Sequence, residues 1–458
     1  MTQTADKRPN VIVFFTDQQR WDTTGAHGNP LELTPNYDRM AANGTHAAYA
    51  FTSQPVCGPS RSCLQTGLYA TASGCFTNSI PLPEGTQTVA HYFKEAGYDT
   101  GYIGKWHLAG TRTQPVPVEK RGGYDYWLAA DSLEHTSDAY RTLLYNEDNE
   151  PVELPGYRVD ALTDAAIRYI ADRRNDEKPF YLFLSYLEPH HQNHRDDYPS
   201  PDIYRGRYSS RYVPPDLAAL SGTAHQHLDG YYGMVKRLDE ALGRLNDALK
   251  SLGMTDNTVM AFTSDHGCHF KTRNGEYKRS CHESSIRVPL AFSGPGFNGG
   301  GTMRELVSLL DLPPTLLDAA GIEVPRHMQG RSILPLVGGN RAARNAWPQE
   351  VFVQISESEV GRAIRTRRWK YAVTAPSGDP IRDSGASDYV ESFLYDLEAD
   401  PYELNNLVDK ESHAEVRAHL RELLIGRMVA AGEAAPVIHA LPTRASGQLK
   451  VSRAEIYE

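Results

Sequence analysis

Short apolar runs alternate with amphipathic stretches through the first 340 residues of this 458-residue chain. Asn10–Thr16, Phe180–Tyr186 and Thr258–Thr263 are rich in β-branched and aromatic residues, as is typical of strands that are covered on both faces. Val159–Arg174 and Thr223–Leu252 repeat apolar residues at helical spacing. Strands that alternate with helices need crossover connections. The pattern therefore predicts an α/β fold, with a mainly parallel sheet flanked by helices.

The character of the sequence changes near Arg341, where short strand candidates separated by turn residues begin. We predict a large α/β domain over residues 1–340 and a smaller C-terminal α+β subdomain over residues 341–458. A last helix is expected from Ser412 to about Ala431. The tail Pro436–Glu458 has little core-like pattern and could wrap around a second copy of the chain in a homo-oligomer. The strand candidates of this subdomain are Val351–Ile355, Ala363–Ile364, Trp369–Val373 and Phe393–Tyr395.

The charge balance and the apolar content exclude several classes of protein. The formal net charge is −10, whereas a general nucleic-acid binder needs a basic face. No apolar run approaches the roughly 18 residues of a membrane-spanning helix. The polar start, Met1–Asn10, leads into the short run Val11–Phe15, which is too brief for a secretory signal. Five cysteines are few and odd in number, which favours a reduced compartment, so we expect a cytoplasmic protein without a membrane or nucleic-acid partner.

Two long segments, Thr111–Gly156 and His190–Ser221, are rich in Tyr, Pro and Asp and show no regular period. We interpret them as irregular loops at the rim of a site. Aromatic faces beside polar groups suit sugar rings, and they also suit a quaternary ammonium through cation–π attraction. The same rings could simply fix the loops to the body of the protein. The aromatic residues concerned are Tyr124, Tyr126, Trp127, Tyr198, Tyr204, Tyr208 and Tyr212.

Acidic residues follow two of the predicted strands directly. Asp17-Gln18 comes after the first strand, and Asp265-His266 comes after the run that ends at Thr263-Ser264. Ligands of parallel α/β proteins collect at the carboxyl ends of the strands. Either pair could instead cap the helix that follows. Two matched pairs nevertheless favour a site for a divalent cation.

The segment Cys57–Gly67 reads C-G-P-S-R-S-C-L-Q-T-G and precedes a helix-like stretch. It places Cys57 near a helix N-terminus, where the pKa of a thiol falls and anions are favoured. Arg61 lies four residues later, on the same helical face. A lone Cys near an Arg is usually structural, but the full pattern C-x-P-S-R-x-x-x-x-T-G is much more specific.

This pattern resembles the core signature of the type I sulfatases, which belong to the alkaline-phosphatase-like superfamily. Cys57, Pro59 and Arg61 match its C-x-P-x-R core. The similarity extends in order from Asp17 to Leu407, which is most of the chain. The further matching segments are Gly104–His107, Glu188–His190, Ser264–Gly267, Lys278, Arg287–Pro289 and Asp400–Leu407.

The resemblance implies a sulfuric ester hydrolase whose cysteine is oxidised to formylglycine by a separate maturation enzyme. The aldehyde at residue 57 would be hydrated, and one hydroxyl would attack the sulfur of a sulfate ester. The implied cation ligands are Asp17, Gln18, Asp265, His266 and residue 57, with Ca²⁺ expected first and Mn²⁺ or Mg²⁺ as alternatives. The implied catalytic residues are Cys57, Arg61, Lys105 and Lys278 around the sulfate, His190 beside the leaving alcohol and His107 as the base that releases sulfate.

Gln18 departs from the consecutive Asp pair of many family members and removes one negative charge from the cation site. A similar Asp-Gln pair occurs in the choline-sulfatase and phosphonate-monoester-hydrolase branches, so both stay open as alternatives. We predict a small sulfated saccharide as the substrate, with His191, His282 and Arg287 as further substrate contacts. Trp106 is expected in the wall of the site. Two other interpretations are a non-catalytic binding protein and a zinc site built from the patch His266, Cys268, His269, Cys281 and His282.

Overall fold

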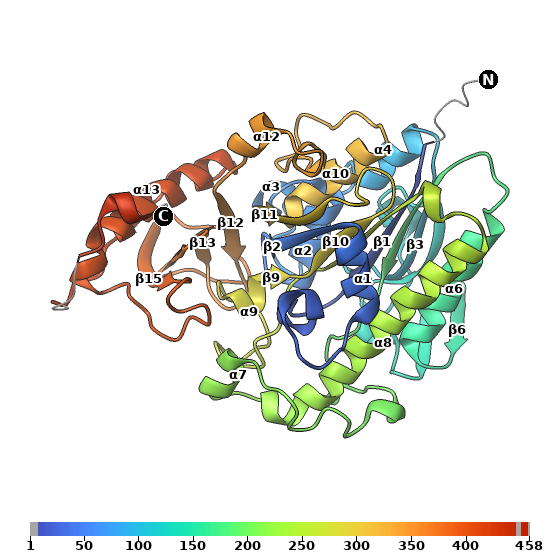
Figure 1. Ribbon diagram of the computed structural model, residues 1–458, viewed down its shortest axis with the longest axis horizontal. Coiled ribbons are helices and arrows are strands. Elements are labelled where there is room, and N and C mark those ends of the chain that lie inside the picture. The colour runs from blue at the N-terminus through green and yellow to red at the C-terminus, as the bar shows by residue number, and fades with distance from the viewer. Residues whose placement is uncertain (1–7, 446–449, 457–458) are drawn as a thin grey trace.

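The computed structural model describes residues 8–445 and 450–456, and Figure 1 shows two units of unequal size. The larger unit is built on an 11-stranded sheet in the order β11-β2-β10-β8-β1-β7-β3-β4-β5-β6, with β9 paired to β2. Its strands are β1 (Asn10–Thr16), β2 (Thr45–Phe51), β3 (Asp99–Lys105), β4 (Tyr126–Ala130), β5 (Arg141–Tyr145), β6 (Pro151–Pro155), β7 (Phe180–Ser185), β8 (Thr258–Ser264), β9 (Arg287–Val288), β10 (Leu290–Ser293) and β11 (Gly301–Ser308).

The centre of this sheet is parallel, as the sequence predicted. Strand β1 runs between β7 and β8 and pairs in parallel with both, and β3 pairs in parallel with β7. Every residue of β1 is buried, which explains its unbroken apolar composition. Because the carboxyl ends of these strands meet at one edge, residues that follow β1, β7 and β8 lie close together.

Helices cover both faces of the sheet (Figure 1). On one face, Ile12 and Phe14 of β1 pack in one core cluster with residues of α1, α6 and α8. On the other face, Val11 and Val13 pack with residues of α2, α4 and α10. The helices are α1 (Pro35–Asn43), α2 (Cys57–Thr66), α3 (Ala70–Ser73), α4 (Val89–Glu95), α5 (Leu133–Thr136), α6 (Arg158–Asp172), α7 (Pro215–Ala219), α8 (Ala224–Ser251), α9 (Glu283–Ile286), α10 (Leu312–Ala319), α11 (Leu334–Val337), α12 (Arg341–Asn345) and α13 (Ala414–Ala430).

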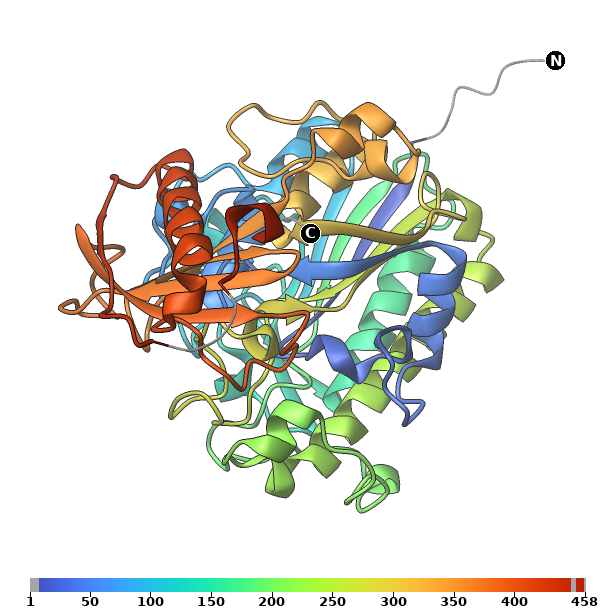
Figure 2. The ribbon, with the colours of Figure 1, turned by 60° about the vertical axis from the view of Figure 1, so that its left-hand side comes forward.

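The smaller unit is the α+β subdomain that the sequence predicted. Its sheet runs β12 (Glu350–Ile355), β13 (Gly361–Thr366), β14 (Trp369–Thr374), β15 (Asp388–Asp396), β16 (Val437–His439), antiparallel except for the last pair. Helix α13 packs on this sheet through Leu420, Leu424 and Met428 (Figure 2). Ala343 and Trp347 still pack on the core of the larger unit, so the predicted boundary at residue 341 stays a prediction.

The structure corrects one detail of the predicted organisation and adds two. Residues 111–156 are not an irregular loop, because they contain β4, α5, β5 and β6. Strands β5 and β6 lie at the sheet edge and are half exposed, so their sequence carries no continuous apolar run. Pro289, which has no backbone N–H, separates β9 from β10. The described part of the tail packs on its own chain, since β16 pairs with β15 and Ile456 is buried, and its contact with a second copy stays a prediction.

Within residues 8–445 and 450–456, no helix combines the length and the apolar character that crossing a membrane requires. Residues 1–7, part of the polar start on which the cytoplasmic prediction rests, lie outside the described residues.

Candidate active site

The candidate site lies where the central strands end. Asp17 follows β1, Lys105 is the last residue of β3, and Asp265 follows β8. The backbone N–H of Asp17 donates to the carbonyl of Glu188, after β7, at 3.1 Å. The N–H of Asp265 donates to the carbonyl of Thr16 at 3.2 Å. These bonds join the strand ends into one rigid platform.

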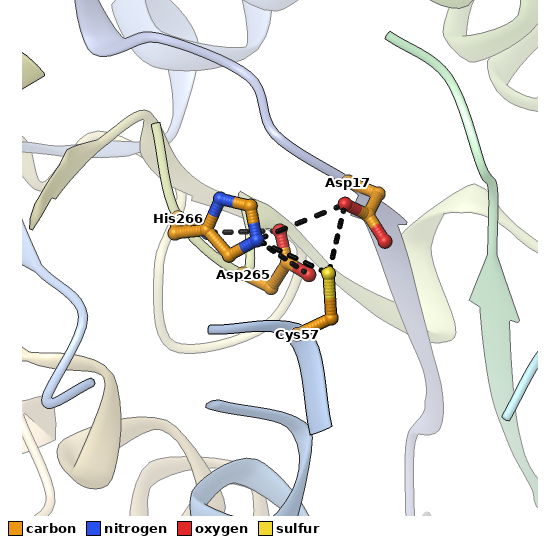
Figure 3. A group of neighbouring side chains, drawn as sticks. All are labelled: Asp17, Cys57, Asp265 and His266. Atoms are coloured by element: carbon orange, nitrogen blue, oxygen red, sulfur yellow. Dashed lines mark hydrogen bonds and ion pairs between the residues drawn. The ribbon is translucent and has the colours of Figure 1, made fainter. Parts of the chain in front are cut away.

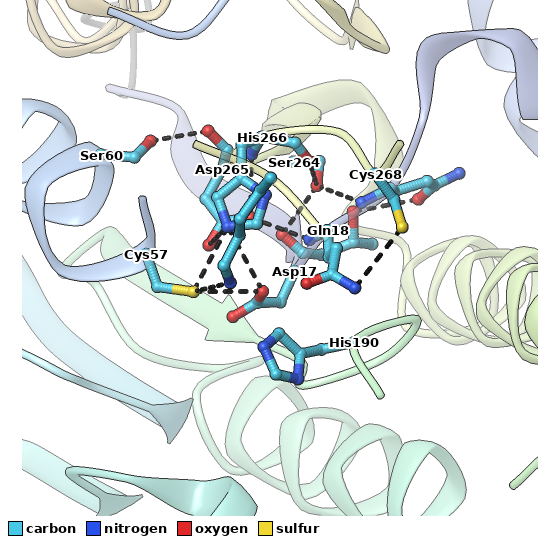
Figure 4. Close-up of polar contacts among 12 residues, drawn as sticks. Asp17, Gln18, Cys57, Ser60, His190, Ser264, Asp265, His266 and Cys268 are labelled. Atoms are coloured by element: carbon cyan, nitrogen blue, oxygen red, sulfur yellow. Dashed lines mark hydrogen bonds and ion pairs between the residues drawn. The ribbon is translucent and has the colours of Figure 1, made fainter. Parts of the chain in front are cut away.

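Helix α2 presents Cys57 to this platform as its first residue (Figure 4). Val56 before it is extended, so α2 begins at Cys57 itself and its N-terminal end faces the site. The Ser60 hydroxyl donates to the carbonyl of Asp265 at 2.7 Å and fixes the helix to the end of β8. The amide of Gly58 donates to Oδ1 of Asn78 at 2.8 Å.

Asp17, Cys57, Asp265 and His266 form a compact group of ligand atoms that all lie within 4.8 Å of one another (Figure 3). The Cys57 Sγ is 3.3 Å from Nε2 of His266 and 3.5 Å from Oδ1 of Asp17. All four residues are buried. Oδ2 of Asp265 and Oε1 of Gln18 are also buried, and neither atom has a hydrogen-bond partner.

These residues fit a divalent cation. Burial and the neighbouring carboxylate of Asp17 raise the pKa of Asp265 to about 7. Arg61 lies 2.9 Å from Oδ2 of Asp17 and 3.7 Å from Oδ2 of Asp265, but Oδ2 of Asp265 and Oε1 of Gln18 still lack a hydrogen bond, which a cation would replace. Oxygen donors with a single imidazole suit Ca²⁺ and also Mn²⁺.

Cationic side chains surround the same point. Lys105 and Arg61 both donate to Oδ2 of Asp17, at 2.8 and 2.9 Å. Lys278 donates to the Sγ of Cys57 at 2.8 Å and makes no ion pair with a carboxylate among the described residues. Burial alone would raise the pKa of the Cys57 thiol, but Lys105 and Lys278 lower it well below its ordinary value. The site therefore favours an anion at residue 57.

The two predicted histidines complete the group. His190 is buried beside Asp17 (Figure 4), and its Nδ1 lies 2.7 Å from the carbonyl of His191. Nδ1 therefore carries the proton, and Nε2 is the unprotonated nitrogen. His107 also lies beside Cys57 and lowers the pKa of the thiol, with a smaller effect than Lys105, Lys278 and His266. All the predicted catalytic and cation-binding residues thus come together around Cys57.

The predicted substrate contacts divide into two sets. His191 stacks on His190 with ring centroids 4.3 Å apart, so it lies next to the site. His282 does not join the site, because its Nε2 is 3.1 Å from the Tyr395 hydroxyl in the smaller unit. Arg287 also points elsewhere, since it donates to the carbonyl of Ala48 and stacks on Trp21. The side chains of His282 and Arg287 contact groups outside the site, so closeness in sequence to Lys278 misled the prediction for both residues.

The structure gives no support to a zinc site. Among the residues that the structure describes, one group of three or more His, Cys, Asp or Glu side chains could share a metal ion. That group consists of Asp17, Cys57, Asp265 and His266. His269 contacts the carbonyl of Lys278, and His282 packs on Phe393.

Comparison with known families decides the identity. Residues 9–322 match the family model described as sulfatase. The chain belongs to the sulfatase family. Residues 275–429 match a second model, described as the C-terminal region of N-sulphoglucosamine sulphohydrolase. The protein is therefore a sulfuric ester hydrolase.

Several relatives are similar over nearly the whole chain. An ulvan-active sulfatase of Formosa agariphila is 31% identical, and the match covers 93% of this chain and 82% of the relative. An N-acetylglucosamine-6-O-sulfatase of Bacteroides thetaiotaomicron is 26% identical, with 91% and 86% covered. A solved structure in complex with its substrate D-glucosamine-2-N,6-O-disulfate shares the fold, with a TM-score of 0.76, 24% identity and 94% and 99% covered.

Most of the aromatic residues predicted at the rim of this sulfatase have packing roles instead. Trp106, Tyr124 and Trp127 are buried in the core of the larger unit, so Trp106 is not a wall of the site. Tyr204 and Tyr208 pack in a cluster with α8. The alternative that the rings fix the loops is therefore correct for these residues, and they provide no argument for a sugar substrate.

Sequence reasoning missed two acidic residues of the sulfatase site. Glu134 of α5 lies 3.3 Å from Nζ of Lys105; burial raises its pKa, but Lys105 lowers it to about 2. Glu357, after β12, accepts from the N–H of Asn78 at 2.5 Å and pairs with Arg279 at 2.7 Å. Through Asn78, the smaller unit thus supports the first turn of α2. Neither residue lies in a recognisable motif, and Glu134 lies in a segment that the sequence presented as a loop.

Proposed function

We propose that this sulfatase hydrolyses a sulfate ester of a small saccharide, with formylglycine at position 57 and a calcium ion beside it. The observation that carries the proposal is the position of Cys57, whose sulfur lies between the oxygen-rich ligand group and the cation Lys278. Its motif, C-x-P-S-R, also supports recognition by a maturation enzyme that oxidises the cysteine.

When present, the cation would be held by Asp17, Gln18, Asp265 and His266 and would supply Lewis-acid charge next to residue 57. The formylglycine hydrate would supply a hydroxyl nucleophile and a second hydroxyl through which sulfate is later expelled. A serine would lack that second group.

The side chains of this chain would perform the remaining steps. Nζ of Lys278, next to residue 57, is placed to contact the sulfate that this residue attacks, where positive charge stabilises the developing anion. In the neutral ring of His190 the proton is on Nδ1, so Nε2 would contact the sulfate, and the ammonium of Lys278 would pass the proton to the leaving alcohol. His107, which lies beside residue 57, would take the proton whose removal expels sulfate and restores the aldehyde. Nη1 and Nη2 of Arg61 are occupied by Asp17, Ser185 and the Lys105 carbonyl, so the role that we assign to Arg61 is to position Asp17.

The identity of the cation follows from the donors. Asp17, Asp265 and Gln18 offer oxygen, which favours Ca²⁺, and the imidazole of His266 makes Mn²⁺ the second candidate. Elemental analysis of protein purified without added metal should find calcium. Stoichiometric manganese would replace that assignment.

A saccharide substrate is supported by the relatives, which are named as sulfatases active on ulvan and on N-acetylglucosamine. Gln18 favours a second candidate, choline sulfate or a phosphonate monoester, because the Asp17-Gln18 pair resembles that of the choline-sulfatase and phosphonate-monoester-hydrolase branches. The test compares kcat/KM for sulfated mono- and disaccharides with values for choline sulfate, an aryl sulfate and a phosphonate monoester. We expect the saccharides to be preferred; preference for either alternative would overturn the substrate assignment and leave the nucleophile untouched. The cytoplasmic location stays a prediction.

A further inference from the structure

The side-chain amide of Gln18 has an oxygen, which can bind a cation, and an NH₂ group, which cannot. Its Nε2 donates to the Tyr198 hydroxyl at 3.1 Å. It also donates to the Sγ of Cys268 at 3.6 Å (Figure 4). Its Oε1 is buried without a partner, and its backbone N–H donates to Oδ1 of Asp265 at 2.9 Å. The amide oxygen is thus the end left free for a cation.

The opposite orientation of the amide is a real competitor. Without a cation, the NH₂ group of Gln18 would gain by facing the carboxylates of Asp17 and Asp265. A cation can bind Gln18 only in the orientation with the oxygen inward. Any group that favours this orientation beforehand therefore raises the affinity for the cation.

Tyr198 is fixed where it can act as that group. Its ring is 5% exposed and packs edge-on against Tyr231, and it also contacts Phe270. Its hydroxyl lies 3.7 Å from the Sγ of Cys268, so the phenol proton has an acceptor of its own. The phenol oxygen then keeps its lone pairs for the NH₂ group of Gln18.

The backbone of Gln18 is fixed separately. Tyr231 donates to its carbonyl at 2.8 Å, and the residue lies in the left-handed region with φ of 67°. The side-chain amide is thus the only part of Gln18 whose direction depends on Tyr198. Removing the Tyr198 hydroxyl should change the orientation of the amide and leave the backbone in place.

We propose that Tyr198 is a positioning residue that holds the amide of Gln18 with its oxygen toward the cation site, assisted by the sulfur of Cys268. The inference rests on the proposed cation site. It assigns to Tyr198 a role in cation affinity, where the sequence suggested only an aromatic rim residue.

The test measures binding of Ca²⁺ to the metal-stripped full chain by calorimetry, independently of turnover. Tyr198→Phe should weaken binding about 10-fold or more, the usual effect of losing a group that orients a metal ligand. The matched control is Tyr277→Phe, which removes a hydroxyl bonded to Asp196 from the same aromatic cluster and should bind Ca²⁺ as the wild type does. In a Gln18→Ala background, Tyr198→Phe should have no further effect.

Cys268→Ala provides a second route to the same result. Without the sulfur, the phenol proton is free to turn toward the amide oxygen, so this variant should also weaken binding. The role of Tyr198 would be overturned if Tyr198→Phe and Tyr277→Phe lost equal affinity for Ca²⁺, or if Tyr198→Phe kept the wild-type affinity. Either result would leave the cation site intact. Failure of the wild-type chain to bind either Ca²⁺ or Mn²⁺ would overturn the cation site itself, and the inference with it.

Discussion

Two clusters of buried charge can be compared in this protein, one around Cys57 and one between the two units. The second, which we call the inter-unit network, consists of Glu283, Arg365, Lys370 and Glu403. Lys370 pairs with Glu283 at 2.9 Å and with Glu403 at 2.6 Å, and Arg365 pairs with Glu283 at 3.2 Å. None of these four side chains has a buried polar atom without a partner.

The cluster around Cys57 differs, because some of its buried polar groups have no partner. Gln18 and Asp265 each keep a buried oxygen without a hydrogen bond, and Lys278 has no carboxylate partner among the described residues. Buried polar groups are almost always satisfied in folded proteins, so such exceptions need an explanation. Here the missing partners are a cation and an anionic substrate. We call a network closed when all its buried polar groups have partners and open when some do not. A closed network stabilises the fold, whereas an open one can bind a ligand.

Substituting Lys370 gives the largest effect expected from this comparison. Lys370→Met leaves the carboxylates of Glu283 and Glu403 close together and undercompensated, so it should lower the free energy of unfolding by about 3–5 kcal/mol. The kcat/KM of the protein that remains folded should stay near the wild-type value. Chemical denaturation measures the free energy of unfolding, and a sulfatase assay measures kcat/KM. A stable but inactive variant would show that the inter-unit network serves catalysis.

The same substitution at Lys278 should have the opposite outcome. Lys278→Met removes a cation next to residue 57, so the rate of sulfate release should fall about 10²–10³-fold, or about 2.7–4 kcal/mol. Stability should not fall, because Lys278 has no carboxylate partner to leave exposed. Lys370→Met is the matched control, as both lysines are buried. Loss of stability without loss of rate would contradict the role given to Lys278.

Removing the cation should change the measured free energy least among these three tests and should act on one cluster alone. If the protein holds the ion at about 100 times its Kd, chelation should cost about 2.7 kcal/mol of stability. Lys370→Met should lose the same amount on chelation as the wild type, because the two clusters are separate. Asp265→Asn should lose much less, since it removes a ligand. Equal sensitivity of Asp265→Asn and the wild type would mean that the stabilising ion lies elsewhere.

The sequence predicted the open cluster better than the closed one. Asp17 and Asp265 could be placed together because parallel strand ends meet at one edge, and Cys57 lies in a distinctive motif. Lys370 carries no such signal, because its partner Glu283 lies in the other unit, far from it in the sequence.

The same limit explains the other errors. Glu357 reaches Asn78 across 279 residues of sequence, a contact that no local pattern encodes. Tyr124 and Trp127 seemed to belong to a rim because the edge strands around them lack a clear period, yet they are buried in the sheet core. Exposure of an aromatic ring depends on packing between distant segments, and a single sequence does not reveal it.

The most direct test of the account is the chemical state of residue 57 in active enzyme. The protein should be produced with and without a formylglycine-generating maturation enzyme, and the peptide that contains Cys57 should be weighed by mass spectrometry. Sulfate release from a sulfated saccharide should be measured on the same samples, with Cys57→Ala as the control. The account predicts that activity rises in proportion to the fraction of peptide carrying the aldehyde and that Cys57→Ala is folded but inactive. Full activity in protein that carries only the thiol would contradict it.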